Sequence, residues 1–197
     1  MFTKTQAKIM EIFVSRITGK FSIRGVAEEL KLAYPLIHRS MQSLLLGGFL
    51  LKDERGLISL NYGGNHGELA YVESLRAKGA LAGDKTIDLF VKDVLERLKE
   101  DFFVFLIFGS FVEKKDPRDI DVLIILDDEK KINDTEKVLV NIAGNFTKKF
   151  EFQVISSKSA QEMLAKRDKI NILNETLNKH ILLFGAENYY RIIKNAR

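Results

Sequence analysis

The sequence predicts an α+β fold in two parts, a small helical domain with a hairpin followed by a small α/β domain. Apolar residues in the first 62 positions recur at helical spacing and end in a hairpin pattern. Further along, two continuous apolar runs, 102–108 and 122–126, have the length of buried strands. A chain of 197 residues has room for one large or two small domains.

Three glycines within residues 61–67 mark the expected domain boundary. We therefore divide the chain into a first domain (1–62), a connector helix with a linker (63–85) and a second domain (86–197). The connector is expected to hold a helix over about 68–78 and a second flexible point at 79–83. This segment could also supply a homodimer contact.

Composition excludes several classes of protein. Apolar residues make up 46% and charged residues 29% of the chain, the proportions of an ordinary soluble protein. The absence of cysteine excludes disulfides and thiolate metal sites. The first residues lack the apolar core of a signal peptide, and no apolar run has membrane-spanning length, so we expect a cytoplasmic protein with no membrane contact. The three histidines are scattered without ligand spacing and are expected to be structural or surface residues.

Capping residues set the elements of the first domain. Thr3 and Gln6 can form a capping box that opens the first helix, and Ser22 can cap the second. The third helix is expected over 35–46, with its proline at a first helical position where the missing N–H costs nothing. Two glycines stop it, and residues 49–61 follow as a hairpin.

Three helices and a hairpin in about 60 residues resemble a winged helix-turn-helix domain, with 35–46 as the recognition helix. The resemblance implies double-stranded DNA as a partner. Hydrogen-bond donors suited to base edges and phosphates lie on the outer face of this helix, with two basic residues on the wing. The DNA-binding candidates are His38, Arg39, Gln42, Lys52 and Arg55.

Charge supports polyanion binding by the first domain only in part. Residues 1–62 hold nine Lys and Arg against five Asp and Glu, which accounts for the whole net charge of +4. On the wing, however, Asp53 and Glu54 are expected to cancel the charges of Lys52 and Arg55. The alternative is that this domain serves protein contacts or dimerisation.

The most informative stretch follows the first buried strand. The apolar run ends in Gly109 and Ser110, where glycine allows a tight turn and serine offers a hydroxyl and a backbone N–H, an arrangement suited to a phosphate. The next strand opens with Asp119 and Asp121, which share one face because strand side chains alternate. Two carboxylates on one face repel each other unless a cation neutralises them, so the pair indicates a metal site.

These residues resemble the signature of the nucleotidyltransferase superfamily that includes DNA polymerase beta and kanamycin nucleotidyltransferase. The signature is hydrophobic-Gly-Ser, a spacer, then Asp-hydrophobic-Asp, and the resemblance covers roughly residues 86–185. It implies a polymerase-beta-like palm in which Gly109 and Ser110 bind the triphosphate of an NTP. It further implies that Asp119 and Asp121 bind two Mg²⁺ ions.

The family also has a third acid on a later strand. The best candidate is Glu151, because residues 150–154 have the expected hydrophobic-acid-hydrophobic form. Gln153 shares its face and is the alternative, which would leave the site one carboxylate short. The sequence departs from the family in a spacer, 111–118, that is shorter than in many members, and in Arg118, which stands where a small residue is common.

The remaining elements are expected to pack around these strands. Asp84 can cap a helix that packs on the sheet. Tyr189 and Tyr190 lie at helical spacing beside isoleucines and are expected to pack in the core. Further helices are expected around 133–147, 158–166 and 168–179, with a short strand or turn at 182–184.

Two functional hypotheses follow. In the first, the protein is an enzyme that moves a nucleoside monophosphate from an NTP to an acceptor hydroxyl, with Glu151 completing one metal's shell and accepting the hydroxyl proton. Small members of the superfamily resemble antitoxins that modify a partner toxin protein, and others act on small molecules or RNA ends. In the second, the protein is a DNA-binding regulator whose palm is a non-catalytic nucleotide sensor or a partner-docking module.

Overall fold

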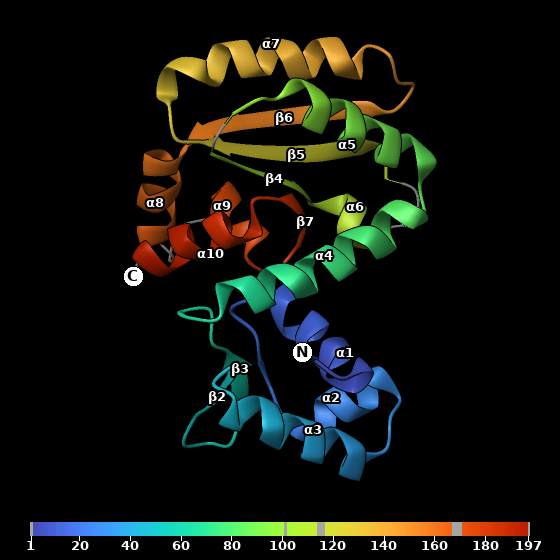
Figure 1. The fold of residues 1–197 in the computed structure, drawn as a ribbon, viewed down its shortest axis with the longest axis vertical. Helices are drawn as coiled ribbons and strands as arrows, with labels where there is room; N and C mark the ends of the chain where they lie inside the picture. Colours follow the sequence, from blue (N-terminus) through green and yellow to red (C-terminus); the bar gives the residue numbers. More distant parts are fainter. Residues whose placement is uncertain (1, 101, 114–116, 167–170, 197) are drawn as a thin grey trace.

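The chain forms an α+β fold with two separate β-sheets (Figure 1). The structure is a computed structural model that describes residues 2–100, 102–113, 117–166 and 171–196. A three-stranded antiparallel sheet has the order β1-β3-β2, and a four-stranded mixed sheet has the order β6-β5-β4-β7. The predicted α+β class is therefore confirmed.

The first part of the chain contains three helices and the small sheet. As predicted, Thr3 and Gln6 form a capping box at the first helix, and the Ser22 hydroxyl caps the second. A two-residue strand between these helices was not expected from the sequence, and it pairs with the second hairpin strand. In order, the elements are α1 (Lys4–Ser15), β1 (Lys20–Phe21), α2 (Ile23–Leu30), α3 (Tyr34–Leu46), β2 (Leu50–Lys52) and β3 (Ile58–Leu60).

A long helix, α4 (His66–Ala82), leads from the small sheet toward the large one (Figure 1). It passes through Gly79 without a break, so the flexible point expected at 79–83 is wrong. Glycine lowers helix propensity by only about 1 kcal/mol, and tertiary packing of α4 on α1, β7 and α10 outweighs that. Asp84 then caps α5 (Lys85–Arg97), as predicted.

The large sheet contains β4 (Phe103–Phe108), β5 (Asp119–Leu126), β6 (Lys149–Ser156) and β7 (His180–Phe184). A single helical turn, α6 (Ser110–Glu113), joins β4 to β5, and a 3₁₀ turn, η1 (Glu129–Lys131), follows β5. The helices α7 (Ile132–Ala143), α8 (Ser157–Ala165), α9 (Ile172–Thr176) and α10 (Ala186–Asn195) complete the fold.

Three sequence predictions differ from these bounds. The helix expected over 133–147 ends at Ala143, because Gly144 and the turn after it lead directly into β6. The helix expected over 168–179 is limited to α9, and residues 167–170 lie outside the described residues. The short strand expected at 182–184 begins earlier, at His180, because it pairs with β4 along the sheet edge.

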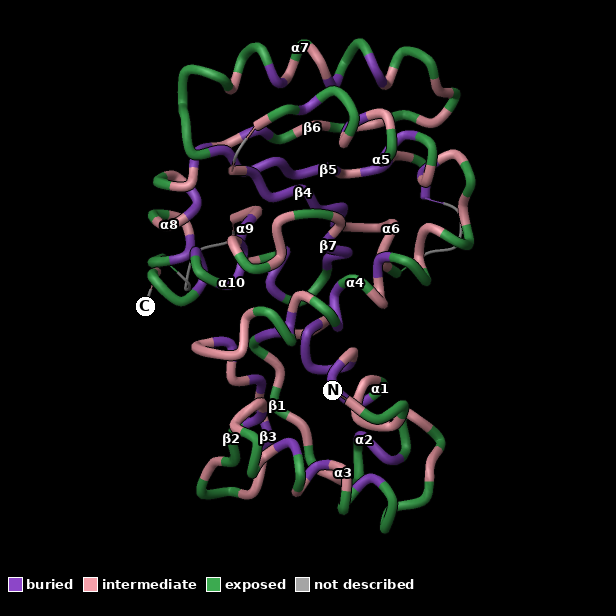
Figure 2. Tube along the Cα trace, viewed as in Figure 1, coloured by how far each residue is buried: buried purple, intermediate pink, exposed green. Residues whose placement is uncertain are grey.

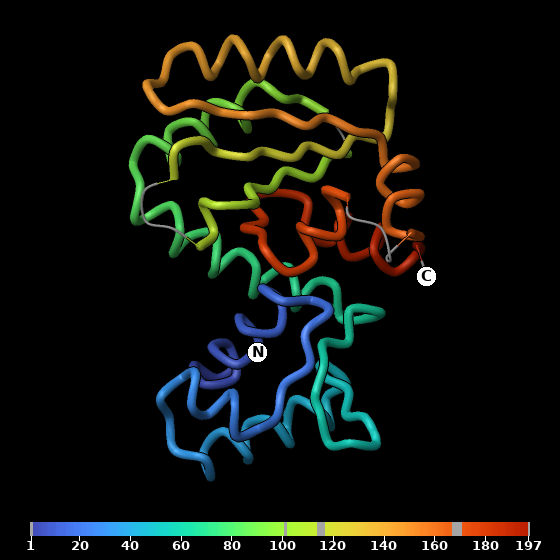
Figure 3. Tube along the Cα trace, turned by 180° about the vertical axis from the view of Figure 1, so that it is seen from behind, coloured from blue at the N-terminus to red at the C-terminus, as the bar shows by residue number. Residues whose placement is uncertain are grey.

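Apolar side chains on the two faces of the large sheet belong to two clusters. On one face, α5 and α7 pack over β4 and β5. The other face packs against α8, α9, α10 and α4, and its cluster continues without interruption into α1, α2 and α3. Figure 2 shows β4 and β5 as buried, and Figure 3 shows from behind that the small sheet and the large sheet lie at opposite ends of the molecule. The predicted division into domains stays a prediction.

Tyr189 and Tyr190 are fully buried in α10, which confirms that they pack in the core. Among the helices that the structure describes, none combines the length and the apolar character that crossing a bilayer requires.

Candidate functional site

The turn after β4 is packed directly against a carboxylate of the next strand. Gly109 has a φ of +68°, in the left-handed region that favours glycine. A Cβ atom at this position would lie 2.3 Å from Oδ2 of Asp121, closer than any side chain tolerates. Only glycine therefore lets the turn approach the Asp121 carboxylate this closely. Ser110, the next residue, opens α6 and is partly exposed.

Asp119 and Asp121 lie at the start of β5, on one face of the sheet. Both are partly exposed, whereas the residues between and after them, from Ile120 and Val122 onward, are buried. Asp121 pairs with Phe108 across the antiparallel β4–β5 ladder. The register thus places the second aspartate directly beside the strand that ends in the glycine turn.

The parallel register of β5 and β6 distinguishes the two candidates for the third acid. Glu151 pairs with Asp121, whereas Gln153 pairs with Leu123, further along the strand. Both candidates project to the same face as the aspartates, so the register decides between them: Glu151 lies beside Asp121, and Gln153 lies two residues further along the strand. Glu151 is exposed, and its carboxylate forms an ion pair with Lys149 on the same strand.

Several acidic side chains lie near one another at this corner of the sheet, and their negative charges repel. Burial, followed by the negative charges of Asp119, Glu151 and Glu175, raises the pKa of Asp121, and the charge of Lys149 opposes this only in part. Hydrogen bonding to Glu151 raises the pKa of Lys149. Glu175, an exposed residue of α9, was missed at the sequence level because no motif connects it to the strands and only the tertiary fold brings it near Asp121.

The donor set fits a magnesium ion that also binds a ligand. Within the described ranges, no group of three or more His, Asp or Glu side chains is arranged to hold a metal ion. Mg²⁺ is commonly bound by one or two carboxylates together with substrate phosphates and water rather than by a complete protein cage. Asp119 and Asp121, partly exposed beside the Gly109 turn, fit that mode, whereas Glu151 is engaged by Lys149.

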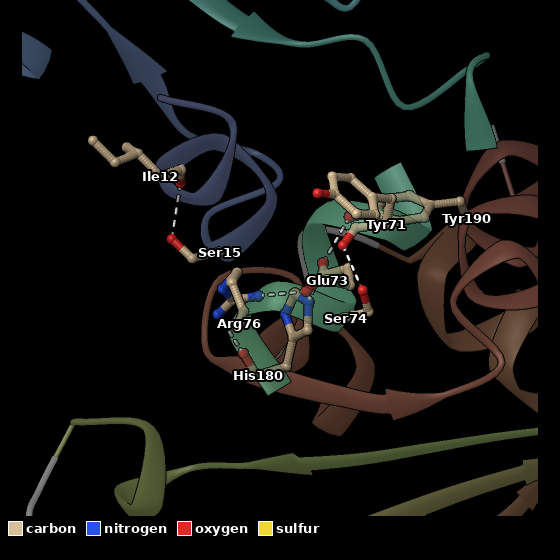
Figure 4. Close-up of polar contacts among 8 residues, drawn as sticks. All are labelled: Ile12, Ser15, Tyr71, Glu73, Ser74, Arg76, His180 and Tyr190. Atoms are coloured by element: carbon tan, nitrogen blue, oxygen red, sulfur yellow. Dashed lines mark hydrogen bonds and ion pairs between the residues drawn. The ribbon is translucent and has the colours of Figure 1, made fainter. Parts of the chain in front are cut away.

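A second group of charged residues lies nearby, buried between α4, β7 and α10 (Figure 4). The Glu73 carboxylate accepts hydrogen bonds from Arg76 at 2.6 Å and from the Tyr190 hydroxyl at 2.8 Å, and it lies 3.1 Å from Nε2 of His180. Arg76 also donates to the backbone oxygen of His180 at 2.7 Å. Burial alone would raise the pKa of Glu73, but the charges of His180 and Arg76 outweigh it and lower that pKa.

The predicted DNA-binding residues lie in the small-sheet half of the molecule. His38 and Arg39 are exposed on α3, Gln42 is partly exposed, and together with Tyr34 they line a shallow hollow. Lys52 and Arg55 are exposed on the hairpin.

The hairpin carboxylate Asp53 has an ion-pair partner outside the hairpin. Asp53 forms an ion pair with Lys20 of β1 at 3.0 Å and accepts hydrogen bonds from two backbone N–H groups of the hairpin turn. It therefore links the hairpin turn to the neighbouring strand, and the expected cancellation of the Lys52 and Arg55 charges stays a prediction.

No protein-family model, curated protein or solved structure matches this chain.

Proposed function

We propose that the protein is a metal-dependent nucleotidyltransferase that moves a nucleoside monophosphate from an NTP to an acceptor hydroxyl. The observation that carries the proposal is the contact between Gly109 and Asp121, where a Cβ atom would lie 2.3 Å from the carboxylate. This contact joins a turn suited to phosphate with a carboxylate suited to a divalent ion. Metal-assisted phosphoryl transfer needs both groups at one point.

Each residue of the site has a role in this proposal. The turn at Gly109 and Ser110 binds the β- and γ-phosphates of the NTP. Asp119 and Asp121 would hold Mg²⁺, and the resemblance to the superfamily implies two ions. When bound, the metal neutralises charge on the phosphates. Glu151, beside Asp121 on the neighbouring strand, receives the proton of the acceptor hydroxyl, whose oxygen bonds to the α-phosphorus as the bond to the β-phosphate breaks and pyrophosphate leaves.

The proposal is tested by calorimetric titration of Mg²⁺ with ATP, GTP, CTP or UTP into the native chain and into the double variant Asp119→Asn/Asp121→Asn. At least one nucleotide should bind the native chain in a metal-dependent manner, and the variant should lose this binding. Transfer of labelled nucleotide to a partner protein, a small molecule or an RNA end should likewise disappear in Asp121→Asn. Equal binding by the two proteins would refute the assignment.

A second candidate function is DNA binding by α3. It is supported by the exposure of His38 and Arg39 and by the net charge of +4 in residues 1–62. Basic side chains that contact phosphates displace counterions, so affinity should fall steeply with salt. DNA binding by α3 is compatible with nucleotidyl transfer by the part of the chain that forms the large sheet. If that part is instead a nucleotide sensor or a docking module without catalysis, DNA binding is the function that remains.

Arg39→Ala tests this candidate. The variant should bind a mixed-sequence DNA duplex about tenfold more weakly than the native chain, with a shallower salt dependence. Lys137→Ala is the matched control, because Lys137 is exposed on α7 at the other end of the molecule. Equal loss in both variants would mean that α3 does not contact the DNA.

A further inference from the structure

A lysine that the sequence motifs do not include contacts the helical turn after Gly109. Nζ of Lys179 lies 3.0 Å from Oε1 of Glu113, the last residue of α6. The two side chains are 46% and 54% exposed. Ser110 and Glu113 are three residues apart in α6 and therefore lie on the same side of that turn. The ammonium group of Lys179 thus stands on the Ser110 side of α6.

The sheet register explains why this lysine is close to the glycine turn. Phe108 pairs with His180 at the end of the antiparallel β4–β7 ladder. Gly109 directly follows Phe108, and Lys179 directly precedes His180. Because the strands are antiparallel, these two residues come next beyond the end of the ladder. Lys179, the residue before β7, therefore flanks the turn on one side, while Asp121 of β5 flanks it on the other.

The backbone on both sides of Lys179 is held by other parts of the molecule. The backbone oxygen of Leu177 accepts a hydrogen bond from Ile17 at 2.9 Å, and the side chain of Asn178 donates to the Thr18 hydroxyl at 2.7 Å. On the other side, His180 is fixed by Glu73 and Arg76. The base of the Lys179 side chain is therefore positioned in advance, whereas its exposed ammonium group can change partner.

The acidic residues around the Gly109 turn favour a cation at the position of Lys179. Asp121 shares a face with Asp119 and pairs with Glu151 across β5 and β6, and Lys149, the ion-pair partner of Glu151, is on β6, the far side of β5 from the turn. A polyphosphate at Gly109 would meet this excess of negative charge. A cation on the β7 side of the turn would offset it from a direction that Lys149 does not cover.

We propose that Lys179 binds the β- and γ-phosphates of a nucleoside triphosphate at the Gly109 turn, and that Glu113 holds its ammonium group when no nucleotide is bound. The inference rests on the proposed function, because it assumes that the turn takes a triphosphate. An ion pair between half-exposed side chains is weak because water screens it, so Lys179 can leave Glu113 at little cost. A phosphate with several negative charges is the stronger partner.

The exchange of partners predicts opposite effects for the two members of the pair. Lys179→Ala should weaken Mg²⁺-ATP binding about tenfold, the loss expected for one charge-assisted hydrogen bond. Glu113→Gln should tighten binding by about threefold, because it removes the competitor for the lysine. In the double variant the gain from Glu113→Gln should vanish. Lys179→Arg should keep most of the affinity, since it keeps the charge.

Two controls separate a phosphate contact from a structural effect. AMP lacks the β- and γ-phosphates, so its affinity should be the same in all of these variants. Lys92→Ala removes a lysine from a comparable exposed ion pair with Asp88, 2.7 Å long, on α5, and should leave ATP binding unchanged. Unfolding curves of the variants should overlay that of the native chain, because both side chains of the Lys179 pair are half-exposed.

Calorimetry of these proteins distinguishes the two proposals. If native protein binds ATP, Asp119→Asn/Asp121→Asn does not, and Lys179→Ala binds as tightly as native, the role of Lys179 is wrong and the proposed function stands. A gain from Glu113→Gln that persists without Lys179 also overturns the inference. If the native chain binds no nucleotide, or the aspartate variant binds as well as native, both proposals fall.

Discussion

Two groups of ionisable side chains lie on the same face of the large sheet, and they differ in how their charges are balanced. Across the sheet, Glu151 of β6 pairs with Asp121 of β5, and Asp121 pairs in turn with Phe108 of β4. Phe108 pairs on its other side with His180 of β7. At the His180 end, Glu73 is fully buried, and its carboxylate is contacted by Arg76, Tyr190 and His180. At the Asp121 end, the carboxylate is partly exposed and most of its charged neighbours are also acids.

The difference separates a structural role from a functional one. The Glu73 carboxylate connects α4, β7 and α10 through its contacts, and removing it leaves the buried Arg76 without its anion. A crowded set of carboxylates instead destabilises the empty site and favours any cation that binds there. The same face of one sheet therefore holds both a group that supports the structure and a group that is suited to a ligand.

The largest expected effect comes from removing the buried Glu73 carboxylate. Glu73→Ala should lower the free energy of unfolding by about 3–5 kcal/mol, because it leaves the buried Arg76 without its anion. Urea unfolding measures the loss. Glu68→Ala, an exposed position of the same helix, is the control and should change stability by less than about 0.5 kcal/mol. Similar values for the two variants would mean that the buried group does not stabilise the fold.

The next effect tests the close contact at the glycine turn. Gly109→Ala and Gly48→Ala both place a side chain on a left-handed backbone, with φ of +68° and +71°, at a cost of about 1–2 kcal/mol each. No atom lies within 4 Å of a Cβ at Gly48, whereas Oδ2 of Asp121 lies 2.3 Å from one at Gly109. Gly109→Ala should therefore be about 1 kcal/mol more destabilising.

Nucleotide binding gives the same comparison a second readout. Gly109→Ala should abolish Mg²⁺-nucleotide binding because it displaces the Asp121 carboxylate, and Gly48→Ala should leave it intact. If both variants bind nucleotide normally, the contact between the turn and Asp121 has no part in the site.

Acid titration should sharpen the contrast. The pKa of Glu73 is lowered in the folded state, so the ionised carboxylate contributes stability above its ordinary pKa, and this contribution is lost as the pH falls through the lowered value. The stability difference between native protein and Glu73→Gln should thus be full at neutral pH and shrink in acid. A difference that is constant from neutral pH into the acid range would argue against an ionised Glu73.

The smallest effect has the opposite sign. The pKa of Asp121 is raised in the folded state, so its ionised form lowers stability above that raised pKa, and the penalty is relieved as the pH falls through it. Without metal, Asp121→Asn should therefore be slightly more stable than native at neutral pH, by less than about 1 kcal/mol, with the gain reduced by salt. A lower melting temperature for the variant would show that the acids are balanced by groups other than a bound cation.

Several elements were predictable because their causes are local. The capping box of Thr3 and Gln6 and the caps at Ser22 and Asp84 act within three residues of the helix start. The buried strands β4 and β5 follow from uninterrupted apolar runs. The continuity of α4 through Gly79 could not be predicted in this way, because packing against α1 and α10 decides it.

In the candidate site, too, the contacts between distant elements could not be predicted from the sequence. Neither Glu175 nor Lys179 belongs to a sequence motif, and each approaches the site from an element far along the chain. The choice between Glu151 and Gln153 needed the register of a parallel strand pair, which no turn between them determines. Likewise, the ion pair between Asp53 and Lys20 could not be predicted, because Lys20 lies on a strand that the sequence did not reveal.

By itself the sequence determined the α+β class, the capped starts of α1, α2 and α5 and the placement of Asp119 and Asp121 on one face, since caps and strand alternation are properties of the neighbouring backbone. The tertiary structure alone decided which charges meet. Glu73 and His180 are 107 positions apart, yet they share a hydrogen bond in the core. Whether a carboxylate finds cations or other acids depends on packing between distant elements, and that packing separates the structural acid from those of the candidate site.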